Sequence, residues 1–482
     1  MPHFRCNLES ASSSLRPVWN HTVGSGHAAL ALRADWREQM TQTRKDLGVR
    51  YVRFHGILGD EMATFIIENG KEIHSWSNID QIFDFLLKIG MRPFVELSFM
   101  PTALASGNTT VFHYKANVTP PNNWQKWDLL IKKLMQHWVD RYGLIEVRKW
   151  FFEVWNEPNL NAFWTGTQAD YFKLYKHTVD AIKSVDGQLQ VGGPATANDQ
   201  WIDDFVAHGK QHDLAIDFIS THHYPTDAFG KPGDDTETEL SLATPGILRE
   251  RTESTCRSAG DIPVYYTEWS SSSNPFFHFH DEPYAAAFLL KNMLDVADLV
   301  HAYSWWTFSD IFEENYFSST PFHGGFGLQT VYGTPKPTYR AMQILNRLGD
   351  KLLPVDGSHH TVTAWVTRKQ DDTVTVLLVN RAFPKHDIRT EVVTVSLDCL
   401  RKPLEITVER IDNTHCNARQ TWKEMGSPEF PSAQQLDILQ AASRLLREPL
   451  TADPYEQGIE FTLSLPPQAI AAVRLKYPKF DT

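Results

Sequence analysis

The stretch Phe-Phe-Glu-Val-Trp-Asn-Glu-Pro-Asn, residues 151–159, decides the fold of this chain. It begins as an apolar, aromatic run typical of a buried strand, and it ends in a polar cluster that Pro158 closes. Such a strand delivers the carboxylate of Glu157 to the rim of a core. Burying a carboxylate costs several kcal/mol unless it is paired, so this position favours a functional role over a stabilising one.

Composition narrows the class of protein. The chain has 482 residues, which is long for one average domain and enough for a large core. Its 46 Lys and Arg and 58 Asp and Glu give a net charge of −12, without a basic block. This balance disfavours nucleic acid and anionic membranes as partners. The 15 Trp and 28 Phe residues suit either sugar-stacking platforms or large apolar cores.

Cysteine usage and the absence of long apolar runs suggest the compartment. The four cysteines lie far apart and form no Cys-x-x-Cys pair: Cys6, Cys256, Cys399 and Cys416. This spacing argues against a zinc site and against a disulfide framework. No run approaches the roughly 18 apolar residues of a membrane span, and residues 1–14 contain no apolar leader segment. We therefore expect a cytoplasmic protein.

Histidine clusters offer no complete metal site. His222 and His223 are adjacent, and His278 and His280 are separated by one residue, but no carboxylate or cysteine completes a spaced ligand set. The sequence thus predicts no metal and no cofactor.

Residues 15–349 alternate between strand-like runs and amphipathic helical stretches, eight of each. The expected strands are residues 15–20, 50–55, 92–98, 150–156, 189–193, 217–223, 263–269 and 302–308. The expected helices are residues 34–47, 77–89, 122–142, 168–185, 199–212, 242–259, 282–300 and 337–348. Eight strands that are each followed by a helix indicate an α/β fold, the parallel (β/α)8 TIM barrel. A doubly wound open sheet is the alternative, but no Gly-rich turn follows the first strand.

Loop lengths are asymmetric along the same region. The helix-to-strand links are short, whereas the strand-to-helix links at 56–76, 99–121, 224–241, 270–281 and 309–336 are long. In a barrel, all strand-to-helix loops gather at the C-terminal face, where active sites are built. The irregular sequence is therefore concentrated on one face, which indicates a function there.

Residues 350–482 follow a different pattern. Alternating or β-branched runs at 361–367, 373–380, 392–397, 404–411 and 459–465 lack intervening helices. This predicts an antiparallel β-sandwich as an accessory domain, with a helical insertion at 432–446. The N-terminal segment 1–14 could add a strand to this domain.

A second carboxylate ends another barrel strand. Residues 264–269 read Val-Tyr-Tyr-Thr-Glu-Trp, so Glu268 closes the seventh strand as Glu157 closes the fourth. Strands four and seven face each other across the mouth of a barrel. A lone glutamate at a strand end is usually a surface or salt-bridge residue, but two facing carboxylates are what glycoside hydrolysis needs.

Several motifs together resemble glycoside hydrolase family 39 of clan A. They are Trp-Asn-Glu-Pro-Asn at 155–159 with Glu268, Val-Gly-Ser-Gly-His-Ala at 23–28, Arg-Phe-His-Gly at 53–56, Tyr-Ser-Trp-Trp-Thr-Phe-Ser-Asp at 303–310 and Trp-Lys-Glu-Met-Gly-Ser-Pro at 422–428. The resemblance spans nearly the whole chain. It implies a retaining double displacement, with Glu157 as acid/base, Glu268 as nucleophile, and carboxyl groups about 5–5.5 Å apart.

The same resemblance assigns neighbouring residues. Asn156 would bind the sugar 2-OH, and Tyr224 would hold the nucleophile. His55 and His222 would line the glycone pocket, although a satisfied core histidine is the alternative for each. Trp305 would form the pocket floor, while Trp306 would pack into the barrel wall. Residues with an equally plausible structural role complete the candidates: Glu313 and Glu314 as contacts to sugar hydroxyls, and Phe163 and Trp164 as an aglycone wall.

The resemblance implies an exo-acting β-D-xylosidase that releases xylose from small xylo-oligosaccharides. Family members that are α-L-iduronidases carry Asp in place of Asn159, and β-glucosidase or α-L-arabinosidase activity stays open. A non-catalytic carbohydrate-binding protein on a barrel fold is the alternative from another class. The sequence also leaves open whether the chain forms a homo-oligomer.

Overall fold

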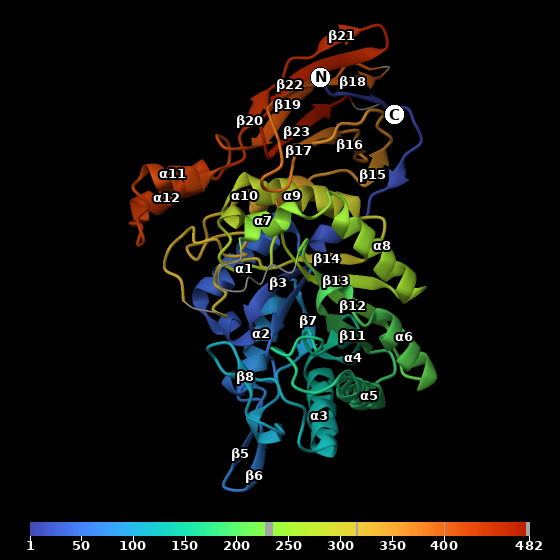
Figure 1. Cartoon of the computed structure of the whole chain (residues 1–482), viewed down its shortest axis with the longest axis vertical. Helices are drawn as coiled ribbons and strands as arrows, with labels where there is room; N and C mark the ends of the chain where they lie inside the picture. The colour runs from blue at the N-terminus through green and yellow to red at the C-terminus, as the bar shows by residue number, and fades with distance from the viewer. Residues whose placement is uncertain (227–234, 315–316, 400, 479–482) are drawn as a thin grey trace.

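The computed structural model describes residues 1–226, 235–314, 317–399 and 401–478. Figure 1 shows a helix-covered barrel with a β-rich domain (orange and red) at one end. A β-hairpin of β5 (Phe65–Glu68) and β6 (Lys71–His74) projects at the opposite end. Among the described residues, no helix has the length and apolarity that crossing a membrane demands.

Eight parallel strands form the barrel, in the spatial order β3-β4-β7-β10-β11-β12-β13-β14. Their bounds are β3 (Thr22–His27), β4 (Tyr51–His55), β7 (Arg92–Leu97), β10 (Phe151–Val154), β11 (Gln190–Thr196), β12 (Phe218–His223), β13 (Val264–Trp269) and β14 (Ala302–Trp305). The backbone N–H of Phe308 donates to the carbonyl of Gly24 over 2.9 Å and links the two end strands. The predicted (β/α)8 barrel is confirmed.

The first strand lies further along the chain than the sequence predicted. Residues 15–20 were expected to form it, but Val18–Asn20 is a short 3-10 helix, and the strand is Thr22–His27. Two glycines lower the strand propensity of this segment and concealed it. Gly24 is needed there, because a Cβ atom would lie 2.4 Å from Cε3 of Trp306.

Helices surround the barrel. The long ones are α1 (Ala34–Leu47), α2 (Ser77–Lys88), α3 (Trp124–Tyr142), α5 (Gln168–Val185), α6 (Ile202–Gln211), α8 (Ile247–Ala259), α9 (Pro283–Asp295) and α10 (Pro337–Asn346), with short α4 (Leu144–Val147) and α7 (Thr236–Ser241) between them. The side chain of Asn123 caps α3, and Thr167 and Asp170 form a capping box on α5. The stretch 242–259, predicted as one helix, begins instead at Ile247.

The barrel interior is layered. Six strands each contribute one residue to a cluster near the strand beginnings. These residues are Tyr51, Phe94, Phe151, Phe218, Tyr265 and Ala302. Two residues further along β4, β7 and β10 come Arg53, Glu96 and Glu153, all fully or almost fully buried. Because strand side chains repeat every two residues, the polar layer lies directly above the aromatic one and below the C-terminal mouth.

The β-domain consists of two sheets with a shared apolar core. One sheet has the order β1 (His3–Asn7), β18 (Glu391–Asp398), β22 (Gly458–Leu465) and β21 (Asp453–Tyr455). The other has the order β2 (Ser13–Ser14), β15 (Lys351–Leu353), β16 (Val362–Arg368), β17 (Val374–Asn380), β23 (Ala469–Lys476), β19 (Glu405–Ile411) and β20 (Arg447–Pro449). The segment from residue 1 to residue 14 thus contributes a strand to each sheet.

Two helices extend from this domain, α11 (Ala418–Glu424) and α12 (Ala433–Ala442). The second falls in the predicted insertion, whereas α11 was not expected. They pack on each other through Ala418, Trp422 and Leu439, together with Phe322 from a barrel loop.

Strand β17 joins the two cores. All its residues are buried: Val374, Val376 and Leu378 face the sandwich core, while Leu377 and Val379 belong to the barrel cluster. A strand buried on both faces reads as a continuous apolar run, which this one does. The β-domain is therefore packed against the barrel through side chains, not only tethered to it.

We predict that Leu377→Ala lowers the free energy of unfolding by about 2–5 kcal/mol, because it leaves a cavity where barrel and β-domain meet. Val392→Ala is the control, since Val392 is 42% exposed, and we expect about 0.5 kcal/mol or less for it. Equilibrium unfolding in urea measures both. Equal losses for the two variants would contradict the packing described.

Candidate active site

A cavity opens at the C-terminal mouth of the barrel. It is lined by polar residues at strand ends and by aromatic residues of the loops: His55, Phe112, Asn156, Glu157, Leu160, Phe163, Tyr224, Glu268, Trp306, Glu314 and Phe326, among others. Of the residues predicted for the site, His55, Asn156, Glu157, Phe163, Tyr224, Glu268 and Glu314 line this cavity. Loops and strands far apart in sequence thus converge on one pocket.

Backbone geometry aims Glu157 into this cavity. Strand β10 ends at Val154, and Trp155 and Glu157 then adopt positive φ angles of 74° and 43°. Left-handed conformations of non-glycine residues cost of order 1–3 kcal/mol each and cluster at functional sites. The backbone N–H of Glu157 donates to the carbonyl of Ala195 over 2.8 Å, which holds the turn against β11.

A β-bulge aims Glu268. Thr221 lies opposite Tyr266, but the next residue, His222, lies opposite Glu268, so β13 carries one extra residue, Thr267. A bulge re-aims side chains and shifts the alternation of the strand by one position. Thr267 and Glu268 consequently both face the barrel axis, although they are adjacent in sequence.

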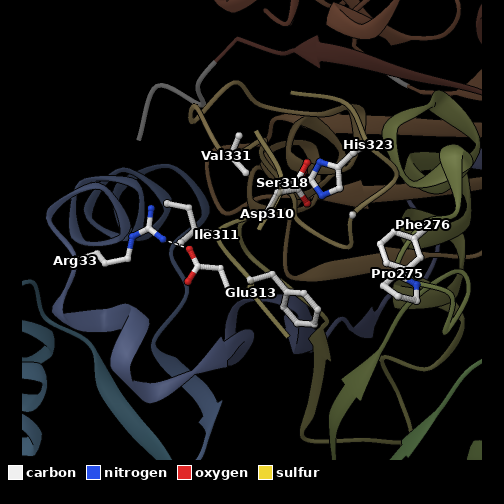
Figure 2. Close-up of a pocket in the computed structure, with 11 residues that line it drawn as sticks. Arg33, Pro275, Phe276, Asp310, Ile311, Glu313, Ser318, His323 and Val331 are labelled. Carbon is white, nitrogen blue, oxygen red and sulfur yellow. Dashed lines mark hydrogen bonds and ion pairs between the residues drawn. The ribbon is translucent and has the colours of Figure 1, made fainter. Parts of the chain in front are cut away.

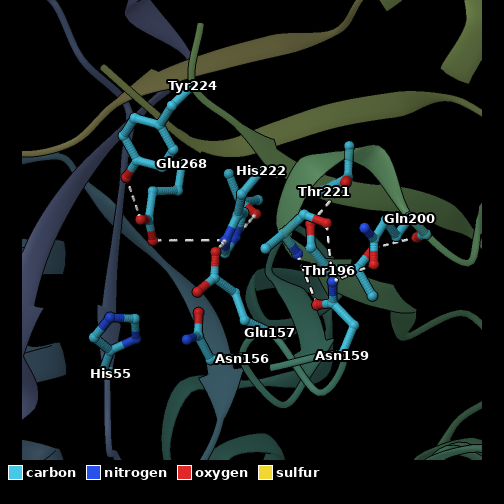
Figure 3. Close-up of polar contacts among 12 residues, drawn as sticks. His55, Asn156, Glu157, Asn159, Thr196, Gln200, Thr221, His222, Tyr224 and Glu268 are labelled. Carbon is cyan, nitrogen blue, oxygen red and sulfur yellow. Dashed lines mark hydrogen bonds and ion pairs between the residues drawn. The ribbon is translucent and has the colours of Figure 1, made fainter. Parts of the chain in front are cut away.

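The two carboxylates form a close pair (Figure 3). One oxygen of Glu157, one of Glu268 and a ring nitrogen of His222 lie within 4.8 Å of one another. His222 Nδ1 lies 3.0 Å from Glu157 Oε1 and 3.6 Å from Glu268 Oε2. Both glutamates are 7% exposed. The spacing matches that of a carboxylate nucleophile and its acid/base partner, about 5–5.5 Å, and not the wider gap of inverting enzymes.

Arg53 is the main cation beneath this pair, and it is fully buried. Its guanidinium contacts Glu153 at 2.6 Å, Glu96 at 2.7 Å, Asn156 Oδ1 at 2.9 Å and Glu268 at 3.5 Å. Burial disfavours its charge, but Glu153, Glu96 and Glu268 outweigh burial and raise the pKa of Arg53. Arg53 belongs to the Arg-Phe-His-Gly motif at 53–56, but no role was predicted for it. An arginine in the middle of an otherwise apolar strand is the signal that could have revealed it.

Opposing effects act on Glu268. Burial raises the pKa of its carboxyl above the usual value, and Arg53, His55 and a hydrogen bond from Tyr224 limit this rise. The Tyr224 hydroxyl donates to Oε1 of Glu268. Burial also raises the pKa of Tyr224 well above its usual value, so this hydroxyl keeps its proton and acts as a donor. Arg53 and Tyr224 therefore favour the ionised form of Glu268.

His55 joins two further carboxyl groups. Its Nδ1 lies 2.7 Å from Glu96, and its Nε2 lies 3.4 Å from Glu314. Burial, followed by the charges of Glu268 and Glu96, raises the pKa of Glu314 well above its usual range. A protonated Glu314 at the cavity wall can donate a hydrogen bond to a ligand hydroxyl.

Glu313 does not line the cavity, which corrects the prediction for it. It forms an ion pair with Arg33 in a neighbouring pocket, where Pro275, Phe276 and Ile311 also lie (Figure 2). Glu313 has a φ of 55°, and this left-handed residue turns the chain so that successive side chains diverge. Sequence alone offered no means of choosing between Glu313 and Glu314.

The two tryptophans at the end of β14 are exchanged relative to the prediction. Trp306 lines the cavity, with its ring 4.9 Å from that of His55 and 5.9 Å from the Arg53 guanidinium carbon. Trp305 points outward, packs edge-to-face on Trp269 and donates its indole N–H to the carbonyl of Phe326. Alternation explains this, because Trp306 shares its parity with Ala302, which lies in the barrel interior.

Trp164 also lies outside the cavity. It is 1% exposed, its ring packs edge-to-face on Trp155 at 5.1 Å, and its indole N–H donates to the carbonyl of Thr167. Its role is packing beneath the turn that presents Glu157. Phe163 next to it does reach the cavity.

A buried ion cluster anchors the loop that carries Glu314. Lys336 Nζ lies 2.6 Å from Asp281 and 2.7 Å from Asp310, and all three side chains are fully buried. Asp281 also accepts from the backbone of Gly324, and Asp310 from that of Gly327. No local pattern indicates this cluster, since Asp281 and Asp310 are 29 residues apart and Asp310 and Lys336 are 26 residues apart along the chain.

Comparison with known proteins agrees with this geometry. The family model described as glycosyl hydrolases family 39 matches residues 3–454. The chain belongs to this family. A protein of Caldicellulosiruptor saccharolyticus named beta-xylosidase is 46% identical over 98% of this chain and 97% of its own length. A protein of Geobacillus stearothermophilus named beta-xylosidase is 38% identical over 88% of this chain and 86% of its own length.

The fold of this family 39 chain also matches a solved structure. A crystal structure of a monomeric beta-xylosidase from Caulobacter crescentus CB15 superposes with a TM-score of 0.89 at 32% identity, covering 99% of both chains. The likeness includes the β-domain as well as the barrel. The predicted membership of glycoside hydrolase family 39 is confirmed.

Proposed function

We propose that the chain is a retaining exo-β-D-xylosidase that removes xylose from the non-reducing end of xylo-oligosaccharides. The observation that carries this proposal is the pair Glu157 and Glu268, with carboxyl oxygens within 4.8 Å of each other in an aromatic cavity. Family membership and two relatives named beta-xylosidase support it.

In the first step, Glu268 attacks the anomeric carbon while Glu157 gives its proton to the departing glycosidic oxygen. The glycosidic bond breaks, and a covalent glycosyl-enzyme ester forms. In the second step, Glu157 takes a proton from water, whose oxygen displaces Glu268 from the sugar. Each step inverts the anomeric carbon, so the product retains its configuration, and Glu157 ends with its proton restored.

Neighbouring groups support these roles. Arg53 and Tyr224 bind the Glu268 carboxylate and orient it. The amide oxygen of Asn156 accepts from Arg53, which turns the amide nitrogen, a donor, toward the cavity and a sugar 2-OH. Trp306 offers an aromatic face for the sugar, and Glu314 and His55 offer hydrogen-bonding groups.

Asn159 bears on the alternative iduronidase activity. Its amide nitrogen donates to the carbonyl of Ala197 at 3.0 Å, and its oxygen accepts from the backbone N–H of Ala197 at 2.9 Å. An ionised aspartate could accept but not donate, so this two-way contact needs the amide.

The intact carboxylate pair also disfavours a purely carbohydrate-binding role.

We also propose the cytoplasm as its location. All four cysteines are unpaired, which suits a reducing compartment.

The activity is tested on a panel of nitrophenyl β-xyloside, β-glucoside, α-L-arabinoside and α-L-iduronide. We expect kcat/KM to be highest for the β-xyloside, by about tenfold or more over the β-glucoside, because the added hydroxymethyl group of glucose needs extra room among the side chains that line the cavity. A higher kcat/KM for one of the other three glycosides would show that xylose is not the preferred sugar. Binding of xylose without turnover of any member would favour the carbohydrate-binding alternative.

Glu268→Ala is expected to lower kcat by about 10⁴-fold or more, because no other group can form the ester. Added azide should restore turnover and give an α-xylosyl azide, identified by NMR. Glu424→Ala, which changes an exposed glutamate, is the control and should keep wild-type activity. A Glu268→Ala enzyme with wild-type kcat would refute the nucleophile assignment.

Glu157→Ala is expected to separate substrates by leaving group. Loss of the proton donor should lower kcat/KM about 10²–10⁴-fold for xylobiose but only slightly for 2,4-dinitrophenyl β-xyloside, whose leaving group needs no proton. Steady-state kinetics on both substrates measures the difference. Equal losses would show that Glu157 is not the proton donor.

A further inference from the structure

We propose that Thr267 and Glu153 are positioning residues that fix the tautomer of His222, so that its bare Nδ1 holds the catalytic proton on Glu157. The inference rests on the proposed function for the role of Glu157. The proton positions follow from the hydrogen-bond geometry together with the burial of the His222 ring.

A linear chain of hydrogen bonds connects these groups. Arg53 Nε donates to Glu153 Oε2 over 2.6 Å, and the Thr267 hydroxyl donates to Glu153 Oε1 over 2.7 Å. His222 Nε2 lies 3.1 Å from the Thr267 oxygen, and His222 Nδ1 lies 3.0 Å from Glu157 Oε1. All are buried, so water cannot substitute for a missing donor along the chain.

The number of hydrogens on each group determines which atom donates and which accepts in each of these hydrogen bonds. Glu153, paired with Arg53, can only accept, and the single hydroxyl hydrogen of Thr267 is used in the bond to it. The Thr267 oxygen must therefore accept from His222, which places a hydrogen on Nε2.

The imidazole carries only this one hydrogen. Burial, assisted by the charges of Arg53 and His55, lowers the pKa of His222 well below its usual value, so the ring is neutral. Its Nδ1 is consequently an acceptor. The contact of 3.0 Å with Glu157 is a hydrogen bond only when Glu157 carries the proton.

Other titratable groups surround this chain of hydrogen bonds, and none in the described part of the protein donates to Nδ1. They include Arg53 and His55 on β4, His223 on β12 and Glu268 on β13. Glu96, Glu314 and Tyr224 contact these residues in turn. Glu268 Oε2 lies 3.6 Å from Nδ1, which exceeds hydrogen-bonding range. Tyr224 directs its hydroxyl to Glu268 instead.

The arrangement suits both steps of the reaction. After Glu157 gives up its proton, its carboxylate faces the lone pair of Nδ1, which is a repulsive contact. Glu157 is then a stronger base toward the water of the second step. Arg53 thus acts on both carboxylates, directly on ionised Glu268 and, through Glu153, Thr267 and His222, on protonated Glu157.

Thr267→Val removes the hydroxyl while keeping the shape of the side chain. Nε2 then loses its acceptor, and the other tautomer can donate from Nδ1 to the Glu157 carboxylate. Glu157 would lose its proton at lower pH, so the alkaline limb of kcat/KM against pH should move down by about one unit. Thr267→Ser keeps the hydroxyl and should keep the wild-type profile.

The outcomes on xylobiose separate positioning from mere packing. A uniform fall in kcat/KM at every pH in Thr267→Val, with the alkaline limb unmoved, would overturn the proposal. A shifted limb in Thr267→Ser as large as in Thr267→Val would overturn it too, because the hydroxyl would then not be the cause.

Neutron diffraction from deuterated crystals of the wild-type protein near pH 7 tests the proton positions without reference to activity. We expect deuterium on Nε2 of His222 and on Glu157, and none on Nδ1. Deuterium on Nδ1 would overturn the proposal. Failure of the proposed function would show instead as an inactive wild type on the glycoside panel, so the two failures are distinguishable.

Discussion

The buried guanidinium of Arg53 is the contact on which the site depends. It lies on β4 and reaches Glu96 on β7, Glu153 on β10 and Glu268 on β13, together with Asn156 beyond the end of β10. Removing one partner from a buried ion pair costs about 3–5 kcal/mol, because the other charge is left uncompensated. Arg53 balances the charge of several carboxylates that lie on different strands. The same contacts that compensate charge in the site therefore also hold neighbouring strands of the barrel together.

Local irregularities in the backbone turn this charged layer into a catalytic geometry. Left-handed residues after β10 present Glu157, and the extra residue in β13 presents Thr267 and Glu268 together. A regular alternation would have left one of the last two facing the helices. The rigid parallel strands then hold both carboxylates at a fixed separation, which a double displacement requires.

The repeated pattern of the sequence was enough to predict the barrel, and strand numbering was enough to pair Glu157 with Glu268. Features that depend on exact register were not predictable in the same way. Counting the parity of β14 correctly would have placed Trp306, not Trp305, in the pocket. The first strand was obscured by Gly24 and Gly26. A side chain at Gly24 would collide with Trp306, and one at Gly26 would collide with the carbonyl of Phe312.

Contacts between residues that are distant in the sequence were also not predicted. Arg53 finds acceptors on three other strands, and Lys336 finds Asp281 and Asp310 across a loop, and no local pattern encodes such contacts. Likewise, Glu313 and Glu314 are equivalent in sequence, and only the left-handed turn at Glu313 separates the one bound to Arg33 from the one at the cavity wall.

We expect two carboxylates this close to act by double displacement. The direct measurement is ¹H NMR of the first sugar released from an aryl β-xyloside, recorded before mutarotation. We expect β-xylose to appear first and the α-anomer to grow in later. Initial release of α-xylose would contradict it.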